Sequence, residues 1–147
     1  YAQSQGVKAH GMNLGGRYVF PFGSVKFVPA LHSSGYEIDG VMTYMGEASG
    51  IILEAEDKKI YHAGDTALFS DMRLFAKDKS IDVAFLPIGD NYTMGPEDAL
   101  EAVSYLNPEI TIPIHYNTFP VIQQNPAIFV EQVVGGKVLN PGETILV

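Results

Sequence analysis

The chain has 147 residues, of which 46% are hydrophobic, so we expect one domain with a substantial core. Its 9 basic and 17 acidic residues give a net charge of −8, which argues against nucleic-acid binding and against docking on anionic lipid, because both need a basic face. The lack of cysteine excludes disulfides, thiolate zinc sites and a cysteine nucleophile, and it suits a cytoplasmic location. No apolar run approaches the ~20 residues of a membrane span.

The first half of the chain predicts strands separated by loops. Residues 1–17 are polar and glycine-rich, which is typical of a loop with weak strand character. Residues 18–31 are apolar and are interrupted by a proline and a glycine, which predicts a hairpin. The Gly- and Ser-rich segment 32–50 predicts a long loop or irregular arm. Residues 50–63 predict two strands joined by a turn at 56–59.

The second half alternates helical and strand patterns, which predicts an α/β layered domain. Apolar spacing or helix-end signals mark helical segments over 66–80, 95–107 and 125–136. Continuous apolar runs predict strands over 81–88 and 109–115, and the chain is expected to close on a short hairpin over 137–147.

Three apolar strands each end on a side chain that can bind a metal. The side chains are His32, Asp65 and His115, and a glycine before Asp65 lets the backbone turn sharply at its strand end. In α/β sheets the carboxyl ends of strands border the ligand crevice. Two imidazoles and a carboxylate there suit zinc, manganese or iron. The separations of 33 and 50 residues mean that only the tertiary fold can bring the three together.

Each of these residues also has a plain structural interpretation. A histidine at a strand end is usually a surface or hydrogen-bonded side chain. Asp65 can be the N-cap of a helix that begins near Thr66. His62 lies on a strand and is expected to be packed or to support a ligand, and His10 is expected on the surface. The segment 87–99 can be only a connection between a strand and a helix.

Three motifs together resemble the metallo-β-lactamase superfamily: "YHAGDTALFSDM", "DVAFLPIGDNYTMGPEDA" and "IPIHYNTFP". Within it they are most similar to the UPF0173 group of bacterial metal-dependent hydrolases. The resemblance extends over nearly the whole chain. It implies a four-layer αβ/βα sandwich with metal ions at one edge between two sheets, and it makes residues 1–147 the carboxy-terminal two thirds of a single such domain.

The resemblance also implies roles for the strand-end residues. His32 matches the third histidine of the first metal site, Asp65 matches the catalytic carboxylate that bridges both metals, and His115 matches the last histidine of the second site. The implied cofactor is two divalent ions per complete site, zinc, manganese or iron. A metal lowers the pKa of bound water from 15.7 to about 7, so the implied reaction is hydrolysis of a small ester, phosphoester, amide or lactone.

The superfamily's His-x-His-x-Asp-His loop is absent from these 147 residues, and the resemblance places it upstream of "YAQSQGVKAHG". Four ligands are therefore expected outside this chain, and the chain alone is expected to be inactive. Its uncovered apolar surface favours a homo-oligomer or pairing with the missing amino-terminal part. The alternative is a truncated, non-catalytic folded or oligomeric module. A nuclease is disfavoured by the acidic charge.

Residues in the loops after the ligand-bearing strands are expected to line the substrate pocket. They are Asp90, Asn91, Tyr92, Met94, Asn117, Thr118 and Phe119. Asn117 can donate a hydrogen bond to a substrate oxygen, and Asp90 can orient a ligand or touch substrate. Phe119 and its neighbour Tyr116 can equally belong to the core.

Overall fold

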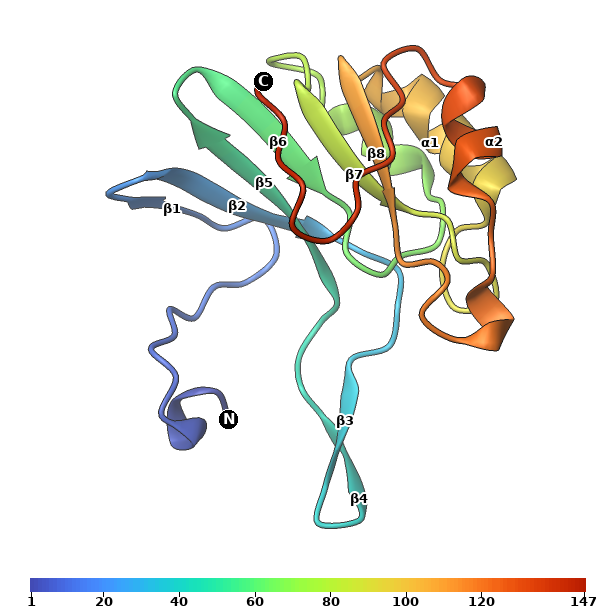
Figure 1. The fold of residues 1–147 in the computed structure, drawn as a ribbon. Helices are drawn as coiled ribbons and strands as arrows, with labels where there is room; N and C mark the ends of the chain where they lie inside the picture. Colours follow the sequence, from blue (N-terminus) through green and yellow to red (C-terminus); the bar gives the residue numbers. More distant parts are fainter.

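The computed structural model describes residues 1–147 and contains a six-stranded mixed sheet with helices packed on it (Figure 1). The sheet has the order β1 (Arg17–Phe20), β2 (Gly23–Pro29), β5 (Ser49–Ala55), β6 (Lys58–His62), β7 (Val83–Pro87) and β8 (Ile110–Ile114). A separate hairpin, β3 (Gly35–Ile38) and β4 (Val41–Tyr44), projects from the body (Figure 1). The helices are α1 (Pro96–Leu106) and α2 (Pro126–Glu131), with 3-10 turns η1 (Gln3–Gln5), η2 (Ser70–Leu74) and η3 (Pro120–Ile122).

Strand direction brings four strand ends to one edge of the sheet. Strands β2 and β6 are each antiparallel to β5, so they run in the same direction. Strands β7 and β8 are parallel to β6. The carboxyl ends of β2, β6, β7 and β8 therefore share one edge, which we call the carboxyl edge.

The two α-helices are too short to be membrane spans, and none of the structure's helices meets the length and hydropathy of one.

The main core lies between the sheet and the elements η2 and α1. Ile52, Tyr61 and Ala84 are register partners on β5, β6 and β7, and all three are buried. Met72 of η2 and Leu106 of α1 are fully buried in the same cluster. Because side chains alternate across a strand, the intervening residues face the other side of the sheet.

The opposite side of the sheet carries a second apolar row. Phe27, Ile51, His62 and Phe85 are register partners across four neighbouring strands. Ile51 is 38% exposed, although it stands in the middle of the sheet. The sheet is thus apolar on both sides, which is the pattern of a sheet that packs between two layers.

Most of the expected strands and helices are confirmed. The structure forms the hairpin expected over 18–31, the two strands expected over 50–63 with their turn at Glu56–Asp57, and the strands expected over 81–88 and 109–115. Helix α1 begins at Pro96 and carries Glu97 and Asp98 in its first turn, where the helix dipole favours acids. The helix expected over 125–136 is shorter, because only Pro126–Glu131 is α-helical.

Three expectations about local structure are wrong. Segment 32–50 contains an ordered hairpin, whose two-residue turn at Asp39–Gly40 has positive φ at both positions, as type I′ turns require. Segment 66–80 forms only the 3-10 turn η2, because its apolar side chains dock on the sheet without a continuous helix. Segment 137–147 forms no strand, so the closing hairpin does not exist.

An ion pair links the edge strand β1 to β5 and predicts a pH effect on stability. Arg17 Nη1 lies 2.6 Å from Glu54 Oε2, and this hydrogen bond lowers the pKa of Glu54. A lowered carboxyl pKa stabilises the fold above the unfolded value of about 4.3 and loses that contribution as pH falls through the folded value. Arg17→Gln should therefore cost at most about 1 kcal/mol at pH 7, because the pair is partly exposed, and less at pH ~3 than at pH 7. Urea denaturation at both pH values measures this, and an equal cost at both would contradict it.

Candidate metal centre

The turn after β6 aims Asp65 along the carboxyl edge. Gly64 has φ +66°, and a Cβ at this position would lie 2.8 Å from the carbonyl oxygen of Ser49. Only glycine fits this left-handed conformation beside a neighbouring backbone. Thr66, fully buried, accepts a hydrogen bond from the Leu31 backbone N–H at 2.9 Å. No α-helix begins here, so the interpretation of Asp65 as a helix N-cap is wrong.

Asp65 and His115 meet at the carboxyl edge. His115 Nε2 lies 3.5 Å from Asp65 Oδ2, with exposed side-chain fractions of 22% and 49%. The other ring nitrogen, Nδ1, is buried and has no hydrogen-bond partner in the structure. Gly89, at the end of β7, packs directly against this histidine, since a Cβ there would lie 3.0 Å from Nδ1. The two side chains are 50 residues apart in sequence and come together through the parallel β6–β7–β8 order.

His32 lies on the same edge but does not join this pair. It follows β2 in an exposed loop, and its Nδ1 lies 2.7 Å from the carbonyl oxygen of Ser33. The loop itself is fixed, because Ala67 N–H donates to the Leu31 carbonyl at 3.1 Å. No group of three histidine, aspartate or glutamate side chains is close enough to hold a metal ion. The expectation that all three side chains meet is thus corrected to a pair, because the ring of His32 lies against its own neighbour's carbonyl.

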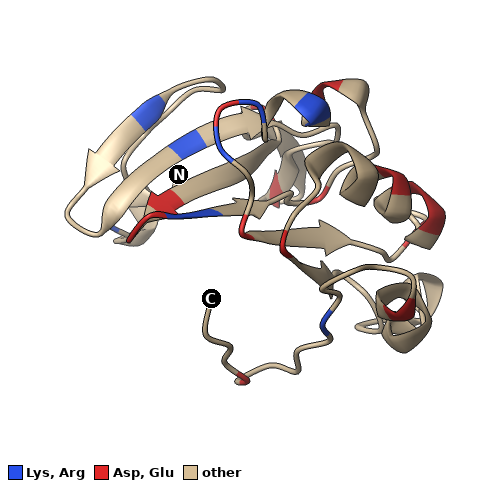
Figure 2. Ribbon diagram, turned by 90° about the horizontal axis from the view of Figure 1, so that it is seen from above, with Lys and Arg blue, Asp and Glu red and all other residues tan.

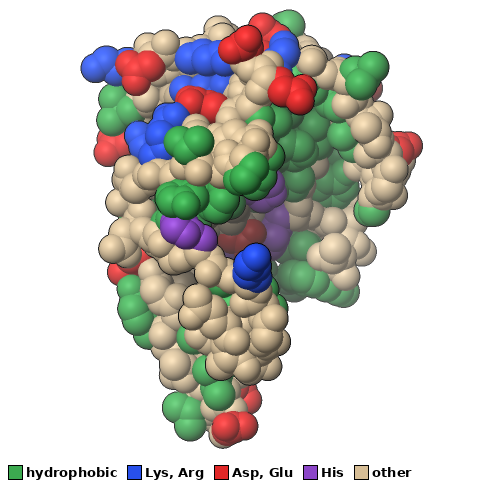
Figure 3. Space-filling model, turned by 90° about the vertical axis from the view of Figure 1, so that its left-hand side faces the viewer, with side chains coloured by type: hydrophobic (Ala, Val, Ile, Leu, Met, Phe, Trp, Pro, Cys, Tyr) green, Lys and Arg blue, Asp and Glu red, His purple; other side chains and the backbone are tan.

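The surface of the molecule has a hollow where histidine and acidic side chains occur together. On the face in Figure 3, histidine side chains border a hollow that has an acidic side chain in its floor. A histidine and a carboxylate side by side, half open to solvent, can bind a cation or share a proton.

An aromatic pair connects the loops that follow β7 and β8. The rings of Tyr92 and Phe119 lie 6.1 Å apart between centroids, and both side chains are exposed. They join the loop after β7 to the loop after β8, and Thr118 is exposed beside them. Phe119 is therefore not a core residue.

The remaining residues expected in the pocket wall hold their own loops. Asp90 Oδ1 accepts from the Asn91 backbone N–H at 2.8 Å, and both residues have positive φ. Asn117 Oδ1 accepts from the Gln124 backbone N–H at 2.8 Å, so this oxygen has a structural partner. Met94 is fully buried in the core, so its expected place in the pocket wall is wrong.

His62 is the last residue of β6, and its side chain is exposed but supports the turn that carries Asp65. Its ring stacks on Phe85 at 5.6 Å, and its Nδ1 accepts from the Gly64 N–H at 3.1 Å. Burial lowers the pKa of His62, and the charge of Asp65 opposes this shift. His10 is exposed, as expected, and its ring lies 4.0 Å from that of Tyr18.

Sequence reasoning missed two residues that shape the centre. Thr66 ties the turn after β6 to the turn after β2, and Gly89 leaves room for His115. The only signal for either was position: Thr66 directly follows Asp65, and Gly89 follows a buried strand. Neither position predicts a contact with a distant segment.

The chain is similar to known proteins over most of its length. The family model described as beta-lactamase superfamily domain matches residues 1–116. A "UPF0173 metal-dependent hydrolase" of Enterococcus faecalis is 99% identical over all 147 residues, and the chain covers 66% of that protein. One of Bacillus cereus is 54% identical over 145 residues, with 96% of this chain and 64% of that protein covered.

Two solved structures show the same fold. Igni18, described as a novel metallo hydrolase from the archaeon Ignicoccus hospitalis, superimposes with a TM-score of 0.83 at 37% identity, covering 97% of this chain and 62% of that one. The metallo-beta-lactamase fold protein YhfI of Bacillus subtilis reaches 0.64 at 10% identity, covering 90% and 52%, which supports the fold alone. The chain spans about two thirds or less of the length of the relatives that it matches. It belongs to the beta-lactamase superfamily, and it has the metallo-β-lactamase type of fold.

Proposed function

We propose that the complete protein is a metal-dependent hydrolase and that Asp65 and His115 hold one of its metal ions. The observation that carries this proposal is the separation of 3.5 Å between Asp65 Oδ2 and His115 Nε2. Zinc binds carboxylate oxygen and imidazole nitrogen at ~2.1 Å, so two ligands of a tetrahedral ion lie about 3.4 Å apart. The observed spacing fits two ligands of one ion.

The types of donor atom support the same assignment. Imidazole nitrogen and carboxylate oxygen suit zinc, manganese or iron, and the cysteine-free composition fits nitrogen and oxygen ligands in a reducing cytoplasm. Asp65 is half exposed, so its second oxygen can reach a second ion. His32 follows β2 on the same edge and is exposed, and it is the candidate for a further ligand in the complete protein. The remaining ligands would come from outside residues 1–147.

A bound metal would supply a water molecule acidic enough to attack at neutral pH. The residues of this chain would then position the reaction. His62 holds the Gly64 turn that aims Asp65, and the Tyr92–Phe119 pair offers an apolar wall to a small substrate. Esters, phosphoesters, amides and lactones of small molecules are the substrate classes that this chemistry allows. Asp90, Asn91, Asn117 and Thr118 would border such a substrate.

A second candidate concerns residues 1–147 by themselves, namely a folded module without turnover. The chain alone forms no group of three ligands, and one side of its sheet keeps apolar residues such as Ile51 exposed. That side would pair with the rest of the complete protein or with a second copy.

Metal removal tests the proposed function in the whole protein that carries this chain. We expect purified protein to contain stoichiometric divalent metal by elemental analysis. Dialysis against a chelator should abolish hydrolysis of a panel of nitrophenyl esters, phosphodiesters, anilides and lactones, and added zinc or manganese should restore it. Circular dichroism before and after dialysis separates loss of metal from unfolding. Turnover that survives complete metal removal would contradict the proposal, as would a protein that binds no metal.

A further inference from the structure

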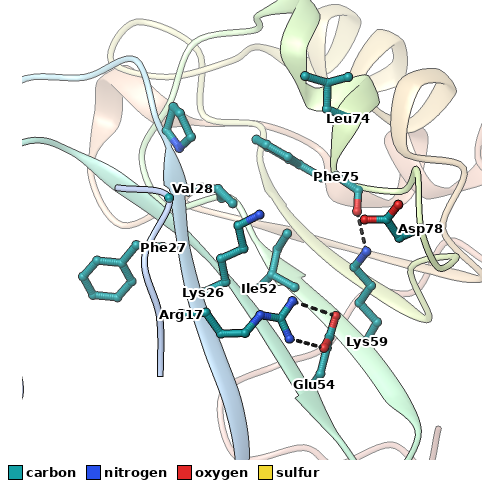
Figure 4. Close-up of a pocket in the computed structure, with 12 residues that line it drawn as sticks. Arg17, Lys26, Phe27, Val28, Ile52, Glu54, Lys59, Leu74, Phe75 and Asp78 are labelled. Carbon is teal, nitrogen blue, oxygen red and sulfur yellow. Dashed lines mark hydrogen bonds and ion pairs between the residues drawn. The ribbon is translucent and has the colours of Figure 1, made fainter. Parts of the chain in front are cut away.

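A cavity lies on the helix side of the sheet, opposite the side that carries the row of Phe27, Ile51, His62 and Phe85. It has a volume of about 250 Å³ and lies where β1, β2, β5 and β6 meet η2 and the segment after it (Figure 4). Val28 and Ile52 line it, and both belong to the core cluster on the helix side. Neither Asp65 nor His115 is among its lining residues, so the cavity is separate from that pair.

Charged side chains from several strands point into this cavity. Three are basic and two are acidic: Arg17, Lys26, Lys59, Glu54 and Asp78. The excess of one positive charge contrasts with the net charge of −8 for the whole chain. Figure 2 shows basic positions on the neighbouring strands at this end of the sheet, whereas acidic positions gather on α1. The cavity is thus a locally basic place on an acidic protein.

Two of the three basic groups already have partners. Arg17 makes two hydrogen bonds to the carboxylate of Glu54, at 2.6 and 3.4 Å. Lys59 is 5% exposed, and its ammonium donates to the carbonyls of Phe75 at 2.5 Å and Lys79 at 3.1 Å. Burial lowers the pKa of Lys59, so an additional anion nearby would favour its charged form.

Lys26 is the basic group without a partner. It makes no hydrogen bond and no ion pair in the structure, and its ammonium points into the cavity (Figure 4). It is also the direct cross-strand partner of Arg17 in the β1–β2 register. Like charges directly opposite each other destabilise a sheet, and whereas Glu54 offsets the charge of Arg17, no protein group pairs with Lys26.

The rest of the lining is apolar. Val28 and Ile52 form one wall, and Leu74 and Phe75 lie across from them (Figure 4). Pockets for drug-sized ligands have volumes of ~300–1,000 Å³, so this cavity suits a smaller molecule. A ligand that matches both the basic side chains and the apolar walls of the cavity carries one negative charge on a short apolar body.

We propose that this cavity binds a small organic carboxylate, whose carboxylate pairs with Lys26 while its apolar body lies between Ile52 and Phe75. Arg17 and Lys59, although engaged with protein oxygens, add attraction from either side. The site is independent of the metal centre, so its occupancy does not require metal.

Hexanoate is the probe, with hexanol and hexylamine as neutral and cationic controls of the same length. In isothermal titration with the whole protein, hexanoate should bind saturably, and the two controls should not. Lys26→Gln should weaken hexanoate binding at least about 10-fold, the usual worth of a charge-assisted hydrogen bond. Lys77→Gln, at an exposed position outside the cavity, is the matched control and should leave binding unchanged.

Methyl NMR of the unsubstituted protein locates the ligand without relying on a variant. Hexanoate should shift the methyl resonances of Val28 and Ile52 and leave those of Ile88 and Ile114 near the carboxyl edge unchanged. Shifts confined to Ile88 and Ile114 would place the carboxylate at the metal centre and overturn the proposal. Hexanol binding as tightly as hexanoate, full binding by Lys26→Gln, or no binding at all would also overturn it.

Discussion

Replacing Asp65 by alanine is expected to remove most bound metal from the whole protein and to lower its hydrolytic rate by more than about 100-fold. Loss of a residue that only supports a metal ligand already lowers metal affinity or activity by ~10–100-fold, and Asp65 would be a direct ligand. Its Oδ2 lies 3.5 Å from His115 Nε2, so the substitution leaves the imidazole alone at the carboxyl edge. Because Asp65 is half exposed and pairs only with His115, the fold itself should tolerate the change.

Elemental analysis and initial rates on the best substrate of the panel measure this result. His115→Ala should lower metal content and rate together, because it removes the other half of the pair. Asp71→Ala is the matched control, since it deletes an exposed aspartate of η2 and should change neither quantity. Unchanged metal content in Asp65→Ala would rule out its role as a ligand.

Gly89→Ala is expected to destabilise the fold by about 1–3 kcal/mol, the usual cost of overpacking. A Cβ at this position would lie 2.3 Å from the carbonyl oxygen of His115, 3.0 Å from its Nδ1 and 3.1 Å from Ile122 Cβ. The nearest of these atoms belongs to backbone and cannot move aside by a change of rotamer. The backbone after β8 must shift, and His115 moves away from Asp65 with it. Metal affinity should therefore fall together with stability.

Gly11→Ala is the control for this change, because a Cβ at Gly11 meets nothing within 4 Å and the residue has no positive φ. Urea denaturation gives the free energy of unfolding, and metal titration of the variant gives the affinity. A Gly89→Ala protein with normal stability and normal metal affinity would show that β7 and β8 can separate at this point without consequence for the centre.

Local pattern was sufficient for most of the strands. The alternation and the turn residues around Gly23 and Asp57 indicated the two antiparallel hairpins, because hairpin pairing depends on neighbours in sequence. The helical period of 66–80 was misleading, since the same apolar spacing lets Met72 and Phe75 dock on a sheet from a single 3-10 turn. The β3–β4 hairpin was missed because its strands have no buried face to impose a pattern.

The sequence by itself determined which chemical groups stand at strand ends, because a strand's apolar run and the polar residue after it are both local features. These local features indicated His32, Asp65 and His115 alike. Only the tertiary structure decided that the side chains of Asp65 and His115 meet and that His32 turns to Ser33, because strand order and rotamers depend on contacts between distant segments. The same holds for Lys26 and Arg17, whose opposition across β1 and β2 follows from the register of a hairpin and from no motif.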